Sequence, residues 1–377
     1  MLDEDLTVCR RCRHRGTACS YADTRAARHT QKPQLLSLGA ERSSLREVGP
    51  QVQSRFDERS SSTDQKRVPS LDDSNHLNFA DILLVCPISA DDISNRWLNS
   101  YIPDDQQKPK IYPANVTTFI SRMLNAYVGV LVRGRGIPPF IHDLQVNSVL
   151  SAPLATCLSV VRMCETVLPA GQTACTDVLC REMYNVYEWR GTFDNTTMLA
   201  AFQAYLIYAL VLFFRLDHES DKLLQESMMK LQEIACMSAR QGLVCAEEQR
   251  SARPGFESWV VAEAKRRTLY TMYLFDSVLL VKDGLPTFMA TEVRGLLAPG
   301  PKSVWTAIAR QQWIHEYNQY LADWPSGCLT IDELWPIPFD FGSQAIAARK
   351  RRVDQWLESV DDYGTMMYAV TSCTHGG

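Results

Sequence analysis

Three cysteines near the N-terminus have a spacing that suits a metal ion. Cys9, Cys12 and Cys19 form a C-x2-C-x6-C pattern, in which the first pair can place two sulfurs on one Zn²⁺ and the third can close over it. A structural zinc site needs four ligands. The fourth would come from His14 or His29, neither of which has a familiar spacing. The pattern therefore predicts zinc binding through three thiolates, with the fourth ligand open.

Arginine fills the gaps between these cysteines. The run holds Arg10, Arg11, Arg13 and Arg15, whose charges favour the thiolate form of the neighbouring sulfurs. A guanidinium group also donates two parallel hydrogen bonds to a phosphate, so the same residues are candidates for DNA binding. The alternative is a basic tail with three incidental thiols.

A resemblance to a known family rests on residues 9–21, C-R-R-C-R-H-R-G-T-A-C-S-Y. They resemble the second half of the zinc binuclear cluster of fungal transcription factors, in which six cysteines in two halves hold two zinc ions. The first half of that cluster carries the turn that enters the major groove, and the acidic residues 1–8 do not supply it. We therefore expect residues 1–24 to be a partial cluster that binds zinc weakly. Either translation begins further upstream or the DNA-reading half is lost.

Composition is that of a globular protein with a basic N-terminal part. Hydrophobic residues make up 46% of the 377 and charged residues 22%, ordinary values for a folded domain. Residues 1–70 hold 13 Lys and Arg against 9 Asp and Glu, so their net charge is +4 and that of the remainder is −8. This distribution favours contact with a polyanion at the N-terminus over contact along the body.

The segment after the cysteines predicts a disordered linker. Residues 25–78 are rich in Ser, Arg, Gln and Asp and poor in apolar residues. Leu38, Leu45 and Val52 stand seven apart, but glycine and proline interrupt a pattern that needs at least three heptads to predict a coiled coil. Other surfaces would have to support a homodimer or a heterodimer.

The remaining cysteines and the longest apolar run predict buried structure. Five thiols lie inside apolar stretches, as expected in a reducing compartment: Cys86, Cys157, Cys164, Cys236 and Cys245. The apolar run 198–214 is shorter than the ~20 residues that span a bilayer. It therefore predicts a core helix, and we expect neither a signal peptide nor membrane association.

Residues 79–377 are predicted to form an all-α domain. Asn115 is expected to cap the first helix, the stretch 134–139 to end it, and Gly242 to cap the fifth. Strand-like alternation is scarce. Apolar residues recur at helical spacing over 115–131, 154–168, 176–190, 196–216, 220–240 and 256–282.

The last of these helices carries the most informative pattern. Glu263 and Arg267 stand four apart, which predicts an ion pair, and Asp276 lies in the apolar half, where a carboxylate needs a partner. The arrangement W-x3-E-x-[KR]-R-R…D resembles the regulatory (middle homology) domain of the same fungal family. Three further stretches share the resemblance: Asn95–Leu98, Asp332–Trp335 and Val370–Gly377. It implies a regulatory body over 79–377.

A second basic run, Arg349, Lys350, Arg351 and Arg352, is a candidate nuclear import signal. The apolar residues around it share one face of a predicted helix, so the same run is also interpreted as the solvated side of that helix.

No motif predicts an enzyme. The sequence lacks G-x-S-x-G, a P-loop and G-x-G-x-x-G. Cys373 with His375 is interpreted as part of a chain end, and His142 with Asp143 as loop residues. Two hypotheses follow. The protein is a nuclear transcription regulator that binds DNA through its cysteine-rich segment, or it is a helical regulatory protein without its own DNA binding. The second would act through a small-molecule effector or by heterodimerisation.

Overall fold

The protein is built from helices, and the all-α prediction is confirmed. The computed structural model describes residues 77–100, 109–110, 112–147, 151–166, 171–216, 222–338 and 340–375. Within these ranges the sheet structure is one short antiparallel ribbon, in which β1 (Pro109–Lys110) pairs with β2 (Thr287–Phe288). Single bridges join Val85 to Val244 and Leu297 to Thr330. The predicted partial cluster (1–24) and all but the end of the predicted linker lie outside the described residues.

The α-helices in chain order are α3 (Ala90–Ser94), α4 (Ala114–Val132), α5 (Asp143–Asn147), α6 (Ala152–Val160), α7 (Gln172–Trp189), α8 (Asn195–Arg215), α9 (Lys222–Arg240), α10 (Phe256–Lys282), α11 (Lys302–Trp305), α12 (Arg310–Asp323), α13 (Ser343–Leu357) and α14 (Asp362–His375). Short 3₁₀-helices are η1 (Arg96–Ser100), η2 (Val161–Cys164), η4 (Arg190–Thr192), η5 (Glu248–Arg250), η6 (Thr291–Val293) and η7 (Ile331–Leu334).

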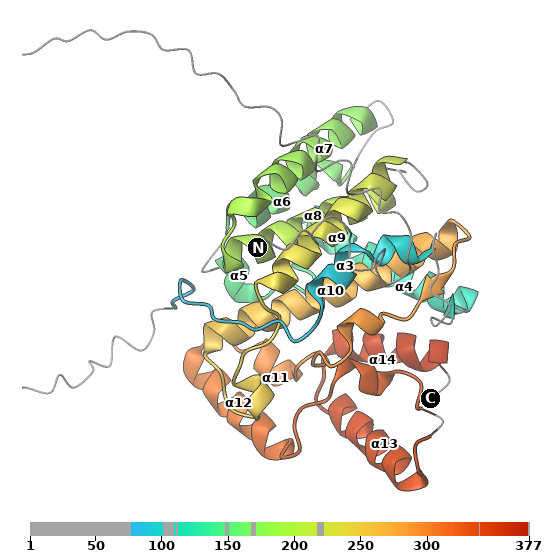
Figure 1. The fold of residues 1–377 in the computed structure, drawn as a ribbon. Helices are drawn as coiled ribbons and strands as arrows, with labels where there is room; N and C mark the ends of the chain where they lie inside the picture. Colours follow the sequence, from blue (N-terminus) through green and yellow to red (C-terminus); the bar gives the residue numbers. More distant parts are fainter. Residues whose placement is uncertain are drawn as a thin grey trace, which may run out of the picture. The chain divides into compact units, whose positions relative to one another are not determined.

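Helix α10 is the axis of the fold. It contacts α4, α8 and α9 on one side and α12 on another, and Figure 1 shows it crossing the centre of the molecule between α6–α9 and α11–α14. Every residue from Phe256 to Val278 is buried except Ser258, which is half-buried. The predicted helix 256–282 is confirmed. Its polar residues are nevertheless enclosed, so they must find partners inside the protein.

Helix α8 is the most apolar element. Asp194 caps it by accepting a hydrogen bond from the backbone N–H of Thr197 at 2.8 Å. By length and composition it is long and apolar enough to cross a membrane, and 89% of its apolar window is buried within the protein. The helix extends beyond the apolar run 198–214, and its burial confirms the prediction of a core helix.

The ends of two helices test the capping predictions. Asn115 was expected to cap the first helix, and this is wrong, because α4 begins one residue earlier and Pro113 occupies the N-cap position without a side-chain cap. Gly242 was expected to end the helix over 220–240, and this is confirmed. It follows α9 with a φ of +106°, and an added Cβ would lie 2.3 Å from the Cβ of Leu84.

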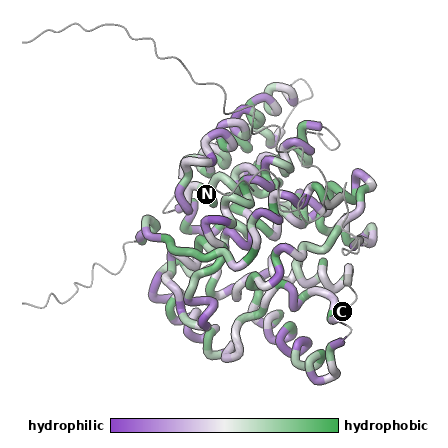
Figure 2. The backbone as a smooth tube through the Cα atoms, in the orientation of Figure 1, coloured by the Kyte–Doolittle hydropathy of each residue, from purple (hydrophilic) through white to green (hydrophobic). Residues whose placement is uncertain are grey.

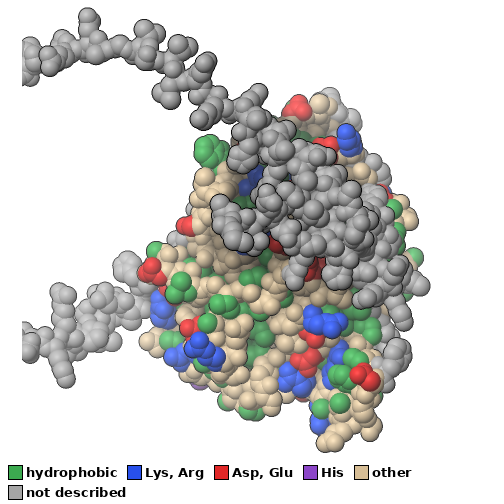
Figure 3. Space-filling view, viewed as in Figure 1, with side chains coloured by type: hydrophobic (Ala, Val, Ile, Leu, Met, Phe, Trp, Pro, Cys, Tyr) green, Lys and Arg blue, Asp and Glu red, His purple; other side chains and the backbone are tan. Residues whose placement is uncertain are grey.

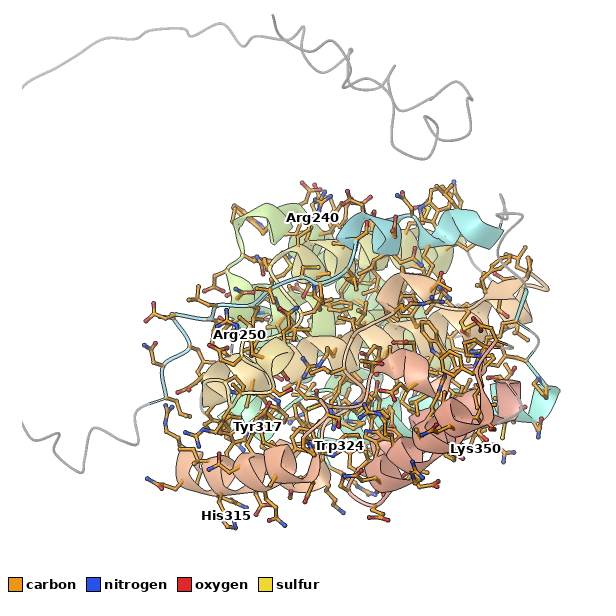
Figure 4. The ribbon with its side chains drawn as sticks, turned by 60° about the horizontal axis from the view of Figure 1, so that its bottom comes forward. Arg240, Arg250, His315, Tyr317, Trp324 and Lys350 are labelled. Carbon is orange, nitrogen blue, oxygen red and sulfur yellow. The ribbon has the colours of Figure 1, made fainter. Side chains whose placement is uncertain are left out.

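The interior contains two clusters of apolar side chains. The larger surrounds α8 and the second half of α10, and the smaller joins the first half of α10 to α11 and α12. In the smaller cluster Trp313 lies 5.2 Å from Phe256 and 4.9 Å from Tyr317, measured between ring centroids. Figure 4 shows Tyr317 pointing from α12 toward the body and His315 pointing away from it. Figure 2 shows the hydrophilic colouring of the outer helices α12 and α13.

Candidate functional site

A cavity of about 60 Å³ lies beside the second half of α10. It is large enough for a few water molecules or a small organic group. Its lining combines apolar side chains with a few polar and charged ones, a composition typical of small-molecule sites. Its lining comes from η1, β1, α10, β2, η6, η7, α14 and the adjoining loops. It includes Arg96, Lys110, Tyr112, Tyr273, Ser277, Trp335 and Thr371.

Arg96 joins four of these elements at the cavity wall. Its Nε lies 2.8 Å from Asp276, its NH1 lies 2.9 Å from Glu292, and its NH2 donates to the carbonyl of Phe288 at 3.2 Å. The guanidinium also lies 4.4 Å from the ring centroid of Tyr273. The expectation that Asp276 needs a partner is confirmed.

Burial and the neighbouring charges set the pKa values of Arg96 and Asp276. Burial by itself would lower the pKa of Arg96, but Glu292 and Asp276 outweigh it, so this pKa lies above its usual value. Burial raises the pKa of Asp276, and Arg96 offsets only part of that rise. Two carboxyl groups therefore depend on one guanidinium for their stability in the interior.

Lys110 of β1 and the nearby Tyr112 add further polar groups to the lining of the cavity. The ammonium of Lys110 donates to the hydroxyl of Tyr112 at 2.5 Å, and that hydroxyl donates to Ser277 at 3.3 Å. The ammonium also lies 4.3 Å from the centroid of the Tyr112 ring. Since Lys110 is only half-buried and pairs with no carboxylate of the described residues, it can receive an anionic group of a ligand.

All four stretches that carry the resemblance contribute to this cavity. Arg96 comes from 95–98, Tyr273 from the α10 pattern, Trp335 from 332–335, and Thr371 from 370–377. Sequence reasoning did not find Lys110 or Tyr112, because the pairing of β1 with a strand 177 residues away leaves no local signal. The sequence identified these four stretches separately, and the structure shows that they line the same cavity.

The first half of α10 carries a second buried network. Glu263 accepts from Arg267 at 2.7 Å, which confirms the predicted pair, and also from Arg266 at 2.8 Å. Arg266 extends to Glu248, and Arg267 to Asp361. The spacing predicted the pair but not its environment, and both Glu263 and Arg267 are fully buried. Through Arg266 the network joins α10 to η5, and through Arg267 it joins α10 to the residue before α14. Its role is structural.

Lys265 is also enclosed in this half of α10. Its ammonium donates to the side-chain oxygen of Asn195 at 2.7 Å and to the carbonyls of Ser238 and Gly242 at 3.1 and 3.3 Å. Burial lowers the pKa of Lys265 to about 7. The lysine ties α10 to the start of α8 and the end of α9, and it titrates near neutrality.

The basic run on α13 is divided between two environments. Arg349 donates to the carbonyls of residues 332, 333 and 335, and Arg352 pairs with Glu333, while Lys350 and Arg351 are exposed. The interpretation as a solvated face therefore holds for only half of the run. Figure 3 shows basic and acidic side chains interspersed over this lower part of the molecule. Its role in nuclear import stays a prediction.

The predicted zinc ligands Cys9, Cys12 and Cys19 lie outside the described residues. So do the four predicted DNA-binding residues, Arg10, Arg11, Arg13 and Arg15. In the part of the chain that the structure describes, no group of three or more His, Cys, Asp or Glu side chains is arranged to hold a metal ion. Zinc binding by Cys9, Cys12 and Cys19 stays a prediction.

The smaller sequence predictions have mixed outcomes. His142 lies in the loop before α5, as interpreted, and is buried there, with its Nδ1 accepting from the N–H of Leu144 at 3.1 Å. Asp143 was also interpreted as a loop residue, and this is wrong, because it begins α5. Cys373 is exposed on α14, which continues to His375. Of the five cysteines expected to be buried, Cys86 is half-buried and the other four are buried.

Comparison of the chain with known family models, with curated proteins and with solved structures finds no match.

Proposed function

We propose that this protein regulates transcription in the nucleus. In this proposal residues 9–19 contact DNA, and the helical body, residues 79–377, is the regulatory part. What supports it is the joint presence of a cysteine–arginine pattern of the zinc-cluster type and a body in which four separate stretches resembling the regulatory domain of that family line one cavity. A domain that senses a ligand needs such an internal site.

The contact with DNA would be chiefly electrostatic. Arg10, Arg11, Arg13 and Arg15 would bind phosphates, and Cys9, Cys12 and Cys19 would shape the turn by holding zinc. Each neutralised phosphate contributes about −0.9 to the slope of log K against log salt, so four arginines give a slope of about −3.6. Binding of this kind is weak and indifferent to sequence.

A salt titration of DNA binding tests this proposal. Gel shifts with the full chain are compared for the wild type, for a variant with the four arginines changed to Gln, and for a control with Arg25, Arg28, Lys32 and Arg42 changed to Gln. Only the first variant should lose most of the slope. Equal effects of the two variants would contradict a specific role for residues 9–19, and tight binding to one defined triplet would contradict phosphate-only contact.

Zinc content is measured on the same samples. With three cysteines we expect less than one firmly bound zinc per chain. One tightly held zinc per chain, lost when Cys9, Cys12 and Cys19 are changed to Ser, would mean that a histidine completes the site.

The second candidate function is a helical regulator without its own DNA binding, and the cavity favours it because residues of the body alone form it. Its ligand would be a small amphipathic anion, with the charged end at Lys110 and the apolar part against Trp335. Thermal shift with a panel of small carboxylic acids tests this, with Ser277→Leu filling the cavity and Ser303→Leu, on the exposed side of α11, as the control. Stabilisation that survives Ser277→Leu would exclude the cavity as its source.

A further inference from the structure

Three arginine side chains lie near the end of α4, two of them over one glycine and the third beside the glycine that follows the helix. Arg133 follows α4, Arg162 lies in η2, and Arg215 is the last residue of α8. A Cβ added to Gly129 would lie 2.9 Å from NH2 of Arg133 and 3.1 Å from NH2 of Arg215, so the two guanidinium groups lie over the same point of α4. Just after the end of α4, a Cβ added to Gly134 would lie 3.3 Å from Nε of Arg162. We call these three residues the arginine triad.

The arginine triad lacks compensating charge within the described part of the chain. None of its three guanidinium groups forms an ion pair or a side-chain hydrogen bond with a described residue, and Nε of Arg215 is buried without a partner. Arg133 and Arg162 are exposed, so water reaches their donors, whereas Arg215 is half-buried. Two like charges held over the same glycine repel each other, and each guanidinium presents up to five N–H donors to a ligand. The partial negative charge at the ends of α4 and α8 offsets only part of this repulsion.

We propose that the arginine triad binds a compact polyanion of the phosphate class, such as the diphosphate group of a small metabolite. Guanidinium groups match phosphate oxygens in bidentate geometry, and one anion placed between Arg133 and Arg215 would satisfy donors of both. A monocarboxylate would neutralise only one of three positive charges, whereas a diphosphate neutralises two or more. This site is separate from residues 9–19 and from the cavity beside α10, so it goes beyond the proposed function.

One internal competitor is visible in the sequence. Asp217, Glu219 and Asp221 come two, four and six residues after Arg215, in a stretch outside the described residues. If their carboxylates were the partners of the arginine triad, no external anion would be needed. The experiment therefore includes a variant in which these three residues become Asn, Gln and Asn.

Isothermal titration of the full chain with inorganic pyrophosphate at low salt tests the proposal. Arg133→Gln and Arg215→Gln should each weaken binding at least tenfold. The matched control is Arg122→Gln, an exposed arginine on the same helix about 16 Å from Arg133 along the axis, and it should change binding less than twofold. Circular dichroism and the melting temperature establish that each variant is folded.

Gly129→Ala separates geometry from charge. It keeps every arginine but places a methyl group where two guanidinium groups now lie, so binding should weaken severalfold. Alanine is the better helix former, so the melting temperature should not fall. Three results would overturn the proposal: no binding by the wild type, equal weakening by Arg122→Gln, or binding that appears only when the carboxylates of 217, 219 and 221 are removed.

Discussion

Arg96 and Asp276 stand 180 residues apart in the chain, and their side chains meet in a buried ion pair of 2.8 Å. The same guanidinium serves Glu292, so one arginine holds η1, α10 and η6 together at the wall of the cavity. The two carboxyl groups cannot return to water without opening this wall. Their dependence on a single cation makes the stability of the body sensitive to this residue.

Arg96→Met should lower the free energy of unfolding by about 3–5 kcal/mol, because it leaves two buried carboxyl groups without a cation. Urea denaturation of the full chain measures this. Arg240→Met is the control, since its ion pair with Asp91 has side chains 61% and 67% exposed. It should lower stability by less than about 1 kcal/mol. Equal losses would mean that the buried group is solvated in solution.

Lys265 should make stability rise with pH above neutrality. In the unfolded chain its amine holds a proton up to about pH 10.5, whereas burial lowers the pKa in the folded protein to about 7. Between these values the unfolded state binds more protons, so this lysine contributes up to about 1.4 kcal/mol of stability per pH unit as the pH rises.

The measurement for Lys265 is the difference in unfolding free energy between the wild type and Lys265→Met at several pH values from 7 to 10. The difference should change with pH in favour of the wild type, while the exposed control Lys350→Met should give a constant difference. Subtraction removes the opposing contribution of the buried thiols. Parallel curves would contradict a lowered pKa for Lys265.

His142 should destabilise the protein in mild acid. Burial lowers its pKa to about 4 from an ordinary value near 6.5, so the unfolded chain takes up a proton first as the pH falls. Stability attributable to this residue is complete above pH 6.5 and is lost down to pH 4, by roughly 3 kcal/mol in total. His142→Gln should abolish this part of the acid dependence. His315→Gln, on the exposed face of α12, should leave it intact.

Gly242→Ala should be strongly destabilising. Its φ of +106° is unfavourable for alanine, and the new Cβ would lie 2.5 Å from a backbone carbon of Leu84. We expect a loss of more than about 2 kcal/mol, with faster amide exchange at Val244, whose N–H bonds to Val85. Gly191→Ala is the control, because nothing lies within 4 Å of its added Cβ. Similar melting temperatures for the two variants would contradict the close approach.

Arg352 and Lys350 should differ although they belong to one basic run. Arg352 makes a two-point contact with Glu333 at 2.7 and 2.8 Å and donates to two carbonyls, whereas Lys350 is exposed. Arg352→Gln should cost about 1–3 kcal/mol and Lys350→Gln less than about 0.5 kcal/mol. Urea denaturation distinguishes them, and equal effects would restore the interpretation of the whole run as a solvated face.

The sequence predicted the helices because apolar periodicity is a local property. The limits of α10 and the partner requirement of Asp276 were correct, since both depend on which residues lie on which face of one helix. The identity of that partner was not predictable, because Arg96 lies 180 residues from Asp276 in the chain and only the tertiary fold brings the two side chains together.

The cavity was less predictable than the helices. Lys110 belongs to a two-residue strand with no periodic pattern, and Tyr112 follows it closely. Only the pairing of β1 with β2 brings the two residues to α10. The burial of Glu263 and Arg267 was missed for a related reason. Spacing predicts that two residues of a helix can touch, but whether water also reaches them depends on η5 and α14, elements distant in the chain.

The burial of α8 has a consequence for how the chain is made. Its sixteen enclosed side chains, Met198–Phe213, leave the ribosome before α9 and α10, the helices that later cover it. Until α9 and α10 have been synthesised, the long apolar helix α8 must be shielded from water by chaperones or by α4 and α6, which precede it in the chain. Synthesis that stops between residues 216 and 282 should therefore yield an aggregating product.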